Sequence, residues 1–264
     1  MVNPVNGTNF HQSDSNNAPN DIMNNIVNAF ESGVVSCIAS DPSTLAQLSP
    51  SQVLGMTDVL QQIGKQIGGS FERDVDTISA ALTSIVKPYN DLPDDDLSAW
   101  VGGQTSFKDY NGGKPVASFT QAAHTVVTVG SSLSSDIKGV NFTEPQVLTM
   151  VQGTLSSVID KLNTEGFGQS QSYAMRIAGS MELFSDMGSS FEGPLANIIT
   201  AVQQDASSWG ETYNTQSGGV NQGVANYNQL TTDLQTLCKD YGNSPQSKDY
   251  PLPTFVPQPP PSTS

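Results

Sequence analysis

Basic residues are scarce in this sequence. Ten Lys and Arg stand against twenty-five Asp and Glu, which gives a formal net charge of −15 over 264 residues. A surface this negative repels nucleic-acid phosphates and anionic lipid headgroups, so we expect no nucleic-acid partner. Charged residues of both signs make up only 13% of the chain, against a usual ~25%. Most of its polarity therefore comes from uncharged residues such as Ser, Thr, Asn and Gln.

Groups that could support catalysis or bind a metal are also few. Of the two histidines, His11 lies in the predicted leader and His124 stands alone on a predicted helix, so we expect neither a zinc-ligand cluster nor an obvious pair with a nucleophilic serine. The sequence contains no Walker A loop and no dinucleotide-binding glycine fingerprint. We therefore predict a protein that is not an enzyme and has no catalytic residue, metal site or cofactor.

The chain has only two cysteines, Cys37 and Cys238. They lie on the apolar faces of the first and the last predicted helix. Free cysteine behaves as a small apolar core residue, which favours two buried free thiols. The alternative is a disulfide that joins the two helices, and it would require an oxidising compartment.

Long apolar runs are missing as well. No stretch of about 18 apolar residues occurs, so we expect no constitutive membrane-spanning helix. Residues 1–20 contain no Lys or Arg and no apolar segment, which argues against a Sec signal peptide and predicts a disordered leader. We expect an extracellular protein, or one on a virion or cell surface, that leaves by a route without such a signal; a cytoplasmic location is the alternative.

What the sequence does contain is a helical period. Ser49, Pro50 and Gln52 form a helix-start pattern, with a capping serine, a proline at the first helical position and a glutamine able to complete a capping box. Apolar residues then recur at steps of three or four. They are Val53, Met56, Leu60, Ile63, Ile67, Phe71, Val75, Ile78, Leu82 and Ile85. Because Pro88 disfavours helical geometry at Lys87, we predict one long helix over residues 50–86. Its length, about 55 Å at 1.5 Å per residue, predicts an elongated bundle.

The rest of the chain predicts an all-α fold of six to seven helices, with coiled-coil-like spacing in places. Helices are expected over 21–39, 118–137, 144–165, 173–187, 194–209 and 220–241, the third of these after a second capping box at Thr143–Gln146. Three regions follow: a leader at 1–20, a helical bundle at 21–242 that includes an acidic, Gly-rich loop at 87–115, and a Pro-rich tail at 243–264. Within the tail, Pro251–Pro261 should be extended polyproline II, either inert or docked in an aromatic groove.

Three glycines inside the predicted long helix form the one candidate site. Each of Gly64, Gly68 and Gly69 lowers helix stability by about 1 kcal/mol relative to alanine, so their crowding needs a compensating reason. Gly64 and Gly68 form a Gly-x-x-x-Gly pair, which allows another helix to approach closely. The alternative interpretation is a hinge, or a face that meets another helix after membrane insertion.

These features favour a non-enzymatic, exported or surface- or virion-assembled protein that acts through protein–protein interaction or self-assembly, for example a secretion-apparatus-associated or structural assembly component. The alternative is an α-helical pore-forming toxin, whose amphipathic helices would contact a membrane only after rearrangement. The net charge of −15 disfavours anionic bilayers for that second class.

Overall fold

The computed structural model describes residues 18–41, 50–90, 117–165, 170–185, 204–205 and 219–259. The leader up to residue 17, most of the 87–115 loop and most of the predicted helix 194–209 lie outside these ranges. The described residues contain helices and no β-strand, which confirms the all-α prediction. The helices are α1 (Ala18–Phe30), η1 (Glu31–Val35), α2 (Ser36–Ser40), α4 (Pro50–Ile67), α5 (Gly69–Asn90), α8 (Ala117–Gly130), α9 (Leu133–Asp136), α10 (Glu144–Glu165), α11 (Ser170–Ser185), α13 (Gly219–Gly242) and η3 (Pro245–Lys248).

The prediction of one long helix over residues 50–86 is wrong, because the structure has two helices there, α4 and α5. α4 ends where the Gly68 N–H donates to the Gly64 carbonyl at 2.6 Å, and Gly68 and Gly69 both have positive φ, 64° and 74°. The chain then reverses. The side chain of Gln61 donates to Asp76 at 3.1 Å, whereas fifteen residues of continuous helix would separate them by about 22 Å. α4 and α5 are therefore a helical hairpin.

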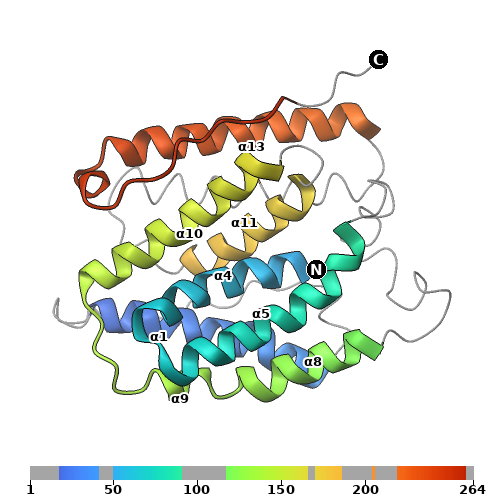
Figure 1. The fold of residues 1–264 in the computed structure, drawn as a ribbon, viewed down its shortest axis with the longest axis vertical. Coiled ribbons are helices and arrows are strands. Elements are labelled where there is room, and N and C mark those ends of the chain that lie inside the picture. The colour runs from blue at the N-terminus through green and yellow to red at the C-terminus, as the bar shows by residue number, and fades with distance from the viewer. Residues whose placement is uncertain are drawn as a thin grey trace.

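α4 lies at the centre of the molecule, between α11, α5 and α10 and against α1 (Figure 1). From Val53 to Leu60 every residue of α4 is buried. The fold is therefore organised around residues 50–67 and not around 50–86. The partner helix α5 continues through Pro88 to Asn90, four residues past the predicted end. A proline in the last turn weakens a helix without excluding it.

The other helix boundaries follow the sequence closely, with one interruption. α1, η1 and α2 form one continuous helix that contains a π-helical turn over Glu31–Val35. The predicted helix 118–137 is broken after Gly130, where an added Cβ would lie 2.7 Å from a Val35 methyl group. Leu133 and Ile137 nevertheless stay buried after the break, as predicted.

α10 begins as the capping pattern predicts. The backbone N–H of Thr143 donates to the side-chain oxygen of Gln146 at 2.9 Å, which is the glutamine half of a capping box. The predicted apolar face of this helix is buried throughout; it consists of Val147, Val151, Leu155, Val158 and Leu162.

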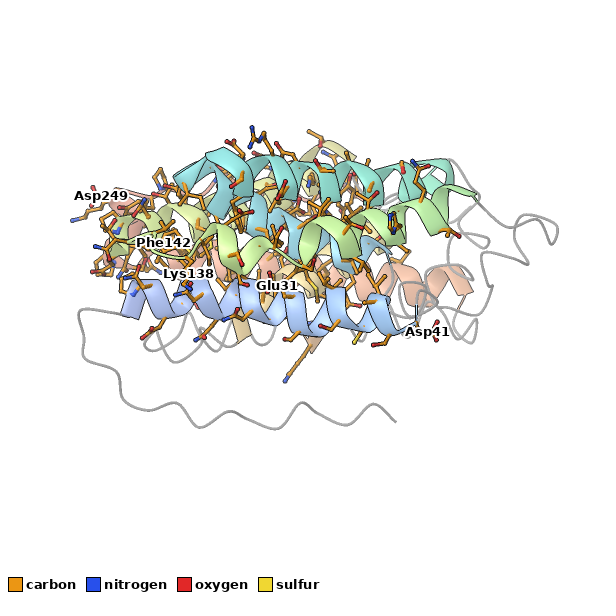
Figure 2. All side chains as sticks on the ribbon, turned by 90° about the horizontal axis from the view of Figure 1, so that it is seen from below. Glu31, Asp41, Lys138, Phe142 and Asp249 are labelled. Atoms are coloured by element: carbon orange, nitrogen blue, oxygen red, sulfur yellow. The ribbon has the colours of Figure 1, made fainter. Side chains whose placement is uncertain are left out.

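Two connections between helices lie at one end of the molecule. Figure 2 shows Asp249, next to η3, and Phe142, in the connection before α10, at the same end, with Asp41 after α2 at the opposite end. η3 has no buried residue. It turns the chain from α13 into the C-terminal segment, which runs back along α13 (Figure 1).

Candidate functional site

The C-terminal Pro-rich segment is held between α10 and α13. We call residues 251–259 the strap. They form neither helix nor strand, as expected for an extended proline-rich chain. The sequence left open whether this segment is free or docked, and in the structure it is docked on the helices of the same chain. Phe255 is only 7% exposed and belongs to the hydrophobic core, whereas the adjacent Val256 is 58% exposed. The strap therefore presents a defined face to the helices.

That face repeats every three residues. Leu252 packs against the core and Phe255 is inside it, and the carbonyl of Gln258 accepts a hydrogen bond from the Tyr227 hydroxyl at 2.9 Å. A polyproline II helix has three residues per turn, which places Leu252 and Phe255 on one side, whereas Gln258 is exposed and is held by its carbonyl. The spacing of the contacts is that of a polyproline II segment seated on one face.

Two side chains of α10 hold the strap by its main chain. The Asn163 amide donates to the Thr254 carbonyl at 2.9 Å, and its side-chain oxygen accepts from the Val256 N–H at 2.8 Å. Gln152, three turns earlier, donates to the Pro251 carbonyl at 2.9 Å. These contacts are made to backbone groups, so they recognise an extended chain irrespective of its side chains.

Two tyrosines of α13 hold the strap from the other side. The Tyr241 hydroxyl donates to the Tyr250 carbonyl at 2.8 Å, just before the strap, and Tyr227 binds Gln258 near its end. Burial raises the pKa of both phenols, although the hydrogen bond to Gln258 opposes this shift at Tyr227, so both hydroxyls keep their protons for donation. The strap runs antiparallel to α13: fourteen helical residues span about 21 Å, and eight polyproline II residues span about 25 Å. We call Gln152, Asn163, Tyr227 and Tyr241 together the strap site.

A cavity of about 440 Å³ lies between the strap and the C-terminal turns of α13. Cys238 and Tyr241 line it on the helix side and Leu252 and Phe255 on the strap side. Burial raises the pKa of the Cys238 thiol, so this thiol is held protonated and weakly nucleophilic under the strap.

Both cysteines are free thiols in the structure, and no disulfide joins them. Cys37 is exposed and Cys238 is half-buried, so the expectation of two buried thiols is wrong for Cys37. Its helix face was assigned from a regular 3.6-residue period, and the π-helical turn over Glu31–Val35 shifts the residues that follow it around the helix axis.

The predicted glycine site lies at the α4–α5 turn. An added Cβ on Gly64 would lie 3.1 Å from the Glu72 Cα, so this position allows the two arms of the hairpin to approach. Gly68 and Gly69 supply the positive φ values of the turn. The closer helix contact involves two glycines outside the predicted site: Gly55, which is a further glycine of the predicted long helix, and Gly179. A Cβ on Gly55 would overlap the Arg176 carbonyl, and one on Gly179 would overlap the Gln52 carbonyl.

A buried ionic group lies beside that α4–α11 contact. The Asp58 side chain on α4 is 4% exposed. It binds the Arg176 guanidinium of α11 and lies 3.4 Å from the Lys161 ammonium of α10. A buried carboxylate is tolerated only when it is paired and hydrogen-bonded. The three charges therefore join the central helix to two of its neighbours.

Two aspartates elsewhere have a raised pKa, and a second aspartate lies beside each of them. A hydrogen bond to Asp233, followed by burial, raises the pKa of Asp205 to about 6. Burial, with the nearby charge of Asp136, raises the pKa of Asp74, and the second Asp136 oxygen, Oδ2, is buried with no hydrogen-bond partner. Such pairs arise because two adjacent carboxylates disfavour joint ionisation.

The described residues contain no group of three or more His, Cys, Asp or Glu side chains placed to hold a metal ion. None of the described helices combines the length and the apolarity needed to cross a membrane. No protein-family model, curated protein or solved structure matches this chain. The candidate functional site is the strap site, which is identified from its contacts with the strap.

Proposed function

We propose that this is a non-enzymatic protein that acts by binding other protein chains, and that the strap site is the surface through which it binds them. One observation carries the proposal: residues 251–259 are held as a peptide ligand is held. Side chains of two helices bind the strap backbone, and two apolar residues three positions apart, Leu252 and Phe255, pack against the hydrophobic core.

The energetics of such a site suit recognition of extended segments. A proline-rich segment loses little conformational freedom on binding, because its polyproline II form is largely preformed. Grooves that receive such segments use aromatic side chains and a few hydrogen bonds to the backbone. Here Tyr227 and Tyr241 are the aromatic residues and Asn163 is the backbone clamp.

The surrounding surface suits a protein that works outside the cell or in a surface or virion assembly. The chain as a whole is acidic and rich in Ser, Thr, Asn and Gln. A component associated with a secretion apparatus, or a structural assembly component, fits these features.

The test is binding of a synthetic peptide that corresponds to residues 249–260, measured by fluorescence anisotropy. The protein is a full-length variant with Leu252→Ala and Phe255→Ala, whose own strap is weakened. We expect it to bind the peptide at least tenfold more tightly than the unmodified chain, in which the attached strap competes at an effective concentration of about millimolar. Adding Asn163→Ala should remove that binding. A variant that keeps its helical circular dichroism and binds no peptide would refute the proposal.

An α-helical pore-former is the second candidate, and the α4–α5 hairpin is the element that favours it. Two glycines of positive φ join its arms, so opening the turn would release an amphipathic helix pair. Dye leakage from neutral and anionic liposomes, at neutral and mildly acidic pH, separates the two candidates. We expect no leakage; leakage at nanomolar protein would favour the pore-former.

A further inference from the structure

We propose that the strap site also receives the strap of a second copy of this chain, so that copies can join by exchanging straps. This inference rests on the proposed function and names the partner. The site is complementary to one known sequence, the Pro-Leu-Pro-Thr-Phe-Val-Pro run of residues 251–257. Every contact made within one chain is available in the same form from another copy, which is the basis of segment exchange between protomers.

The connection before the strap is suited to opening. Its hydrogen bonds are local: Asn243 N–H to Lys239, Ser244 N–H to Tyr241, and Asp249 N–H to Gln246. η3 buries no residue. The connection can therefore straighten without removing any side chain from the core. What must be released is the strap itself, which means Leu252, Phe255 and the hydrogen bonds to the strap site.

Charge permits the strap to cross between copies. Two copies each carrying −15 repel one another, but residues 251–264 contain no Asp, Glu, Lys or Arg. An uncharged segment can therefore enter the neighbouring site without adding to the repulsion. Because the bodies still repel, exchange should increase with salt, which screens their charges, and with protein concentration, because the attached strap competes for its own site.

The experiment uses two full-length chains in which Cys37 and Cys238 are replaced by serine. One carries Thr164→Cys, an exposed position adjacent to Asn163, and the other carries Val256→Cys on the exposed side of the strap. The chains are mixed at a few hundred micromolar, treated with a short bis-maleimide and separated by mass. We expect a covalent heterodimer whose yield increases with salt and falls when excess peptide 249–260 is added before the bis-maleimide.

The matched control adds Leu252→Ala and Phe255→Ala to the chain that carries Val256→Cys. We expect the heterodimer to fall at least fivefold, because the apolar residues that seat the strap are gone. An undiminished yield would mean random contact and would overturn the proposal. A second result would also overturn the proposal: no heterodimer forms, although a single chain that carries both Thr164→Cys and Val256→Cys cross-links within itself. In that second case the anisotropy result would stand, and the proposed function would survive without the self-partner.

Discussion

Arg176 on α11 meets Asp58 on α4 in a two-point pairing, in which Nε binds Oδ2 and a terminal guanidinium nitrogen binds Oδ1 at 2.6 Å. Arg176 is 20% exposed and Asp58 is 4% exposed. Lys161, the second cation, is 27% exposed and lies at a longer distance of 3.4 Å. The pairing with Arg176 is therefore the one that neutralises the buried carboxylate.

Arg176→Ala should destabilise the fold by about 3 kcal/mol, because it leaves a buried charge without its main partner. Lys161→Ala should have a smaller effect, about 1 kcal/mol or less, as expected for a longer and more exposed ion pair. Urea denaturation followed by circular dichroism measures both. Equal losses for the two variants would contradict the assignment of Arg176 as the principal partner.

Gly179→Ala should destabilise the fold by more than about 2 kcal/mol, because its methyl group would overlap the Gln52 carbonyl and force α11 away from α4. The separation would also strain the hydrogen bond of 2.9 Å from the Ser180 hydroxyl to the Gly55 carbonyl. Gly33→Ala is the matched control, since nothing lies within 4 Å of its added methyl group. It should be neutral or stabilise the fold by up to about 1 kcal/mol. A thermal melt that ranks the two variants in the opposite order would refute the close contact.

Gly68→Ala distinguishes a hairpin from a continuous helix. With φ at 64°, alanine should destabilise the fold by about 1–2 kcal/mol, whereas in a continuous helix it would be stabilising by about 1 kcal/mol. Gly68→Asn should be less harmful than Gly68→Ala, because asparagine tolerates left-handed geometry. Chemical denaturation of the three proteins gives the sign directly.

Asp233→Asn should change how stability depends on pH. Because the pKa of Asp205 is raised to about 6 in the folded chain, its contribution to stability is fully present below its ordinary value of 3.8 and is lost as the pH rises through about 6. Removing the Asp233 charge should lower the pKa of Asp205. The variant should therefore exceed the unmodified protein in stability at pH 8 and lose that advantage at pH 4. Melting temperatures across this range test the sign, and parallel curves would contradict the assignment of Asp233 as the cause of the raised pKa of Asp205.

The faces of the helices could be predicted from the sequence, and the reversal within the predicted long helix could not. Val53, Leu60, Ile78 and Leu82 are buried as their spacing indicates. Ile67 and Phe71 lie four positions apart on either side of the turn, so the reversal leaves the helical period uninterrupted in the sequence. Only Gly68 and Gly69 mark it, and a glycine pair is compatible with a close helix contact, a hinge or a turn.

The strap site was the least predictable part. Asn163 is one of many polar residues on α10, and its partners lie 91 to 95 positions away, so no local pattern identifies it. A signal was present in the tail itself. Leu252 and Phe255 stand three apart between prolines, which is the spacing of one polyproline II face. That spacing indicates an anchored segment, whereas the proline content alone indicates only an extended one.

The separation in sequence between Asn163 and the strap also means that α10 is synthesised well before the strap that it binds. Asn163 and Val256 are separated by 93 positions, and synthesis at roughly 5–20 residues per second needs about 5 to 20 s to cover them. During that interval α10 can fold while its ligand has not yet been made. Tyr227 and Tyr241, the other half of the strap site, are made only shortly before the strap itself, so a trailing nascent chain on a polysome presents only the α10 half of the site to the strap of the finished chain ahead of it.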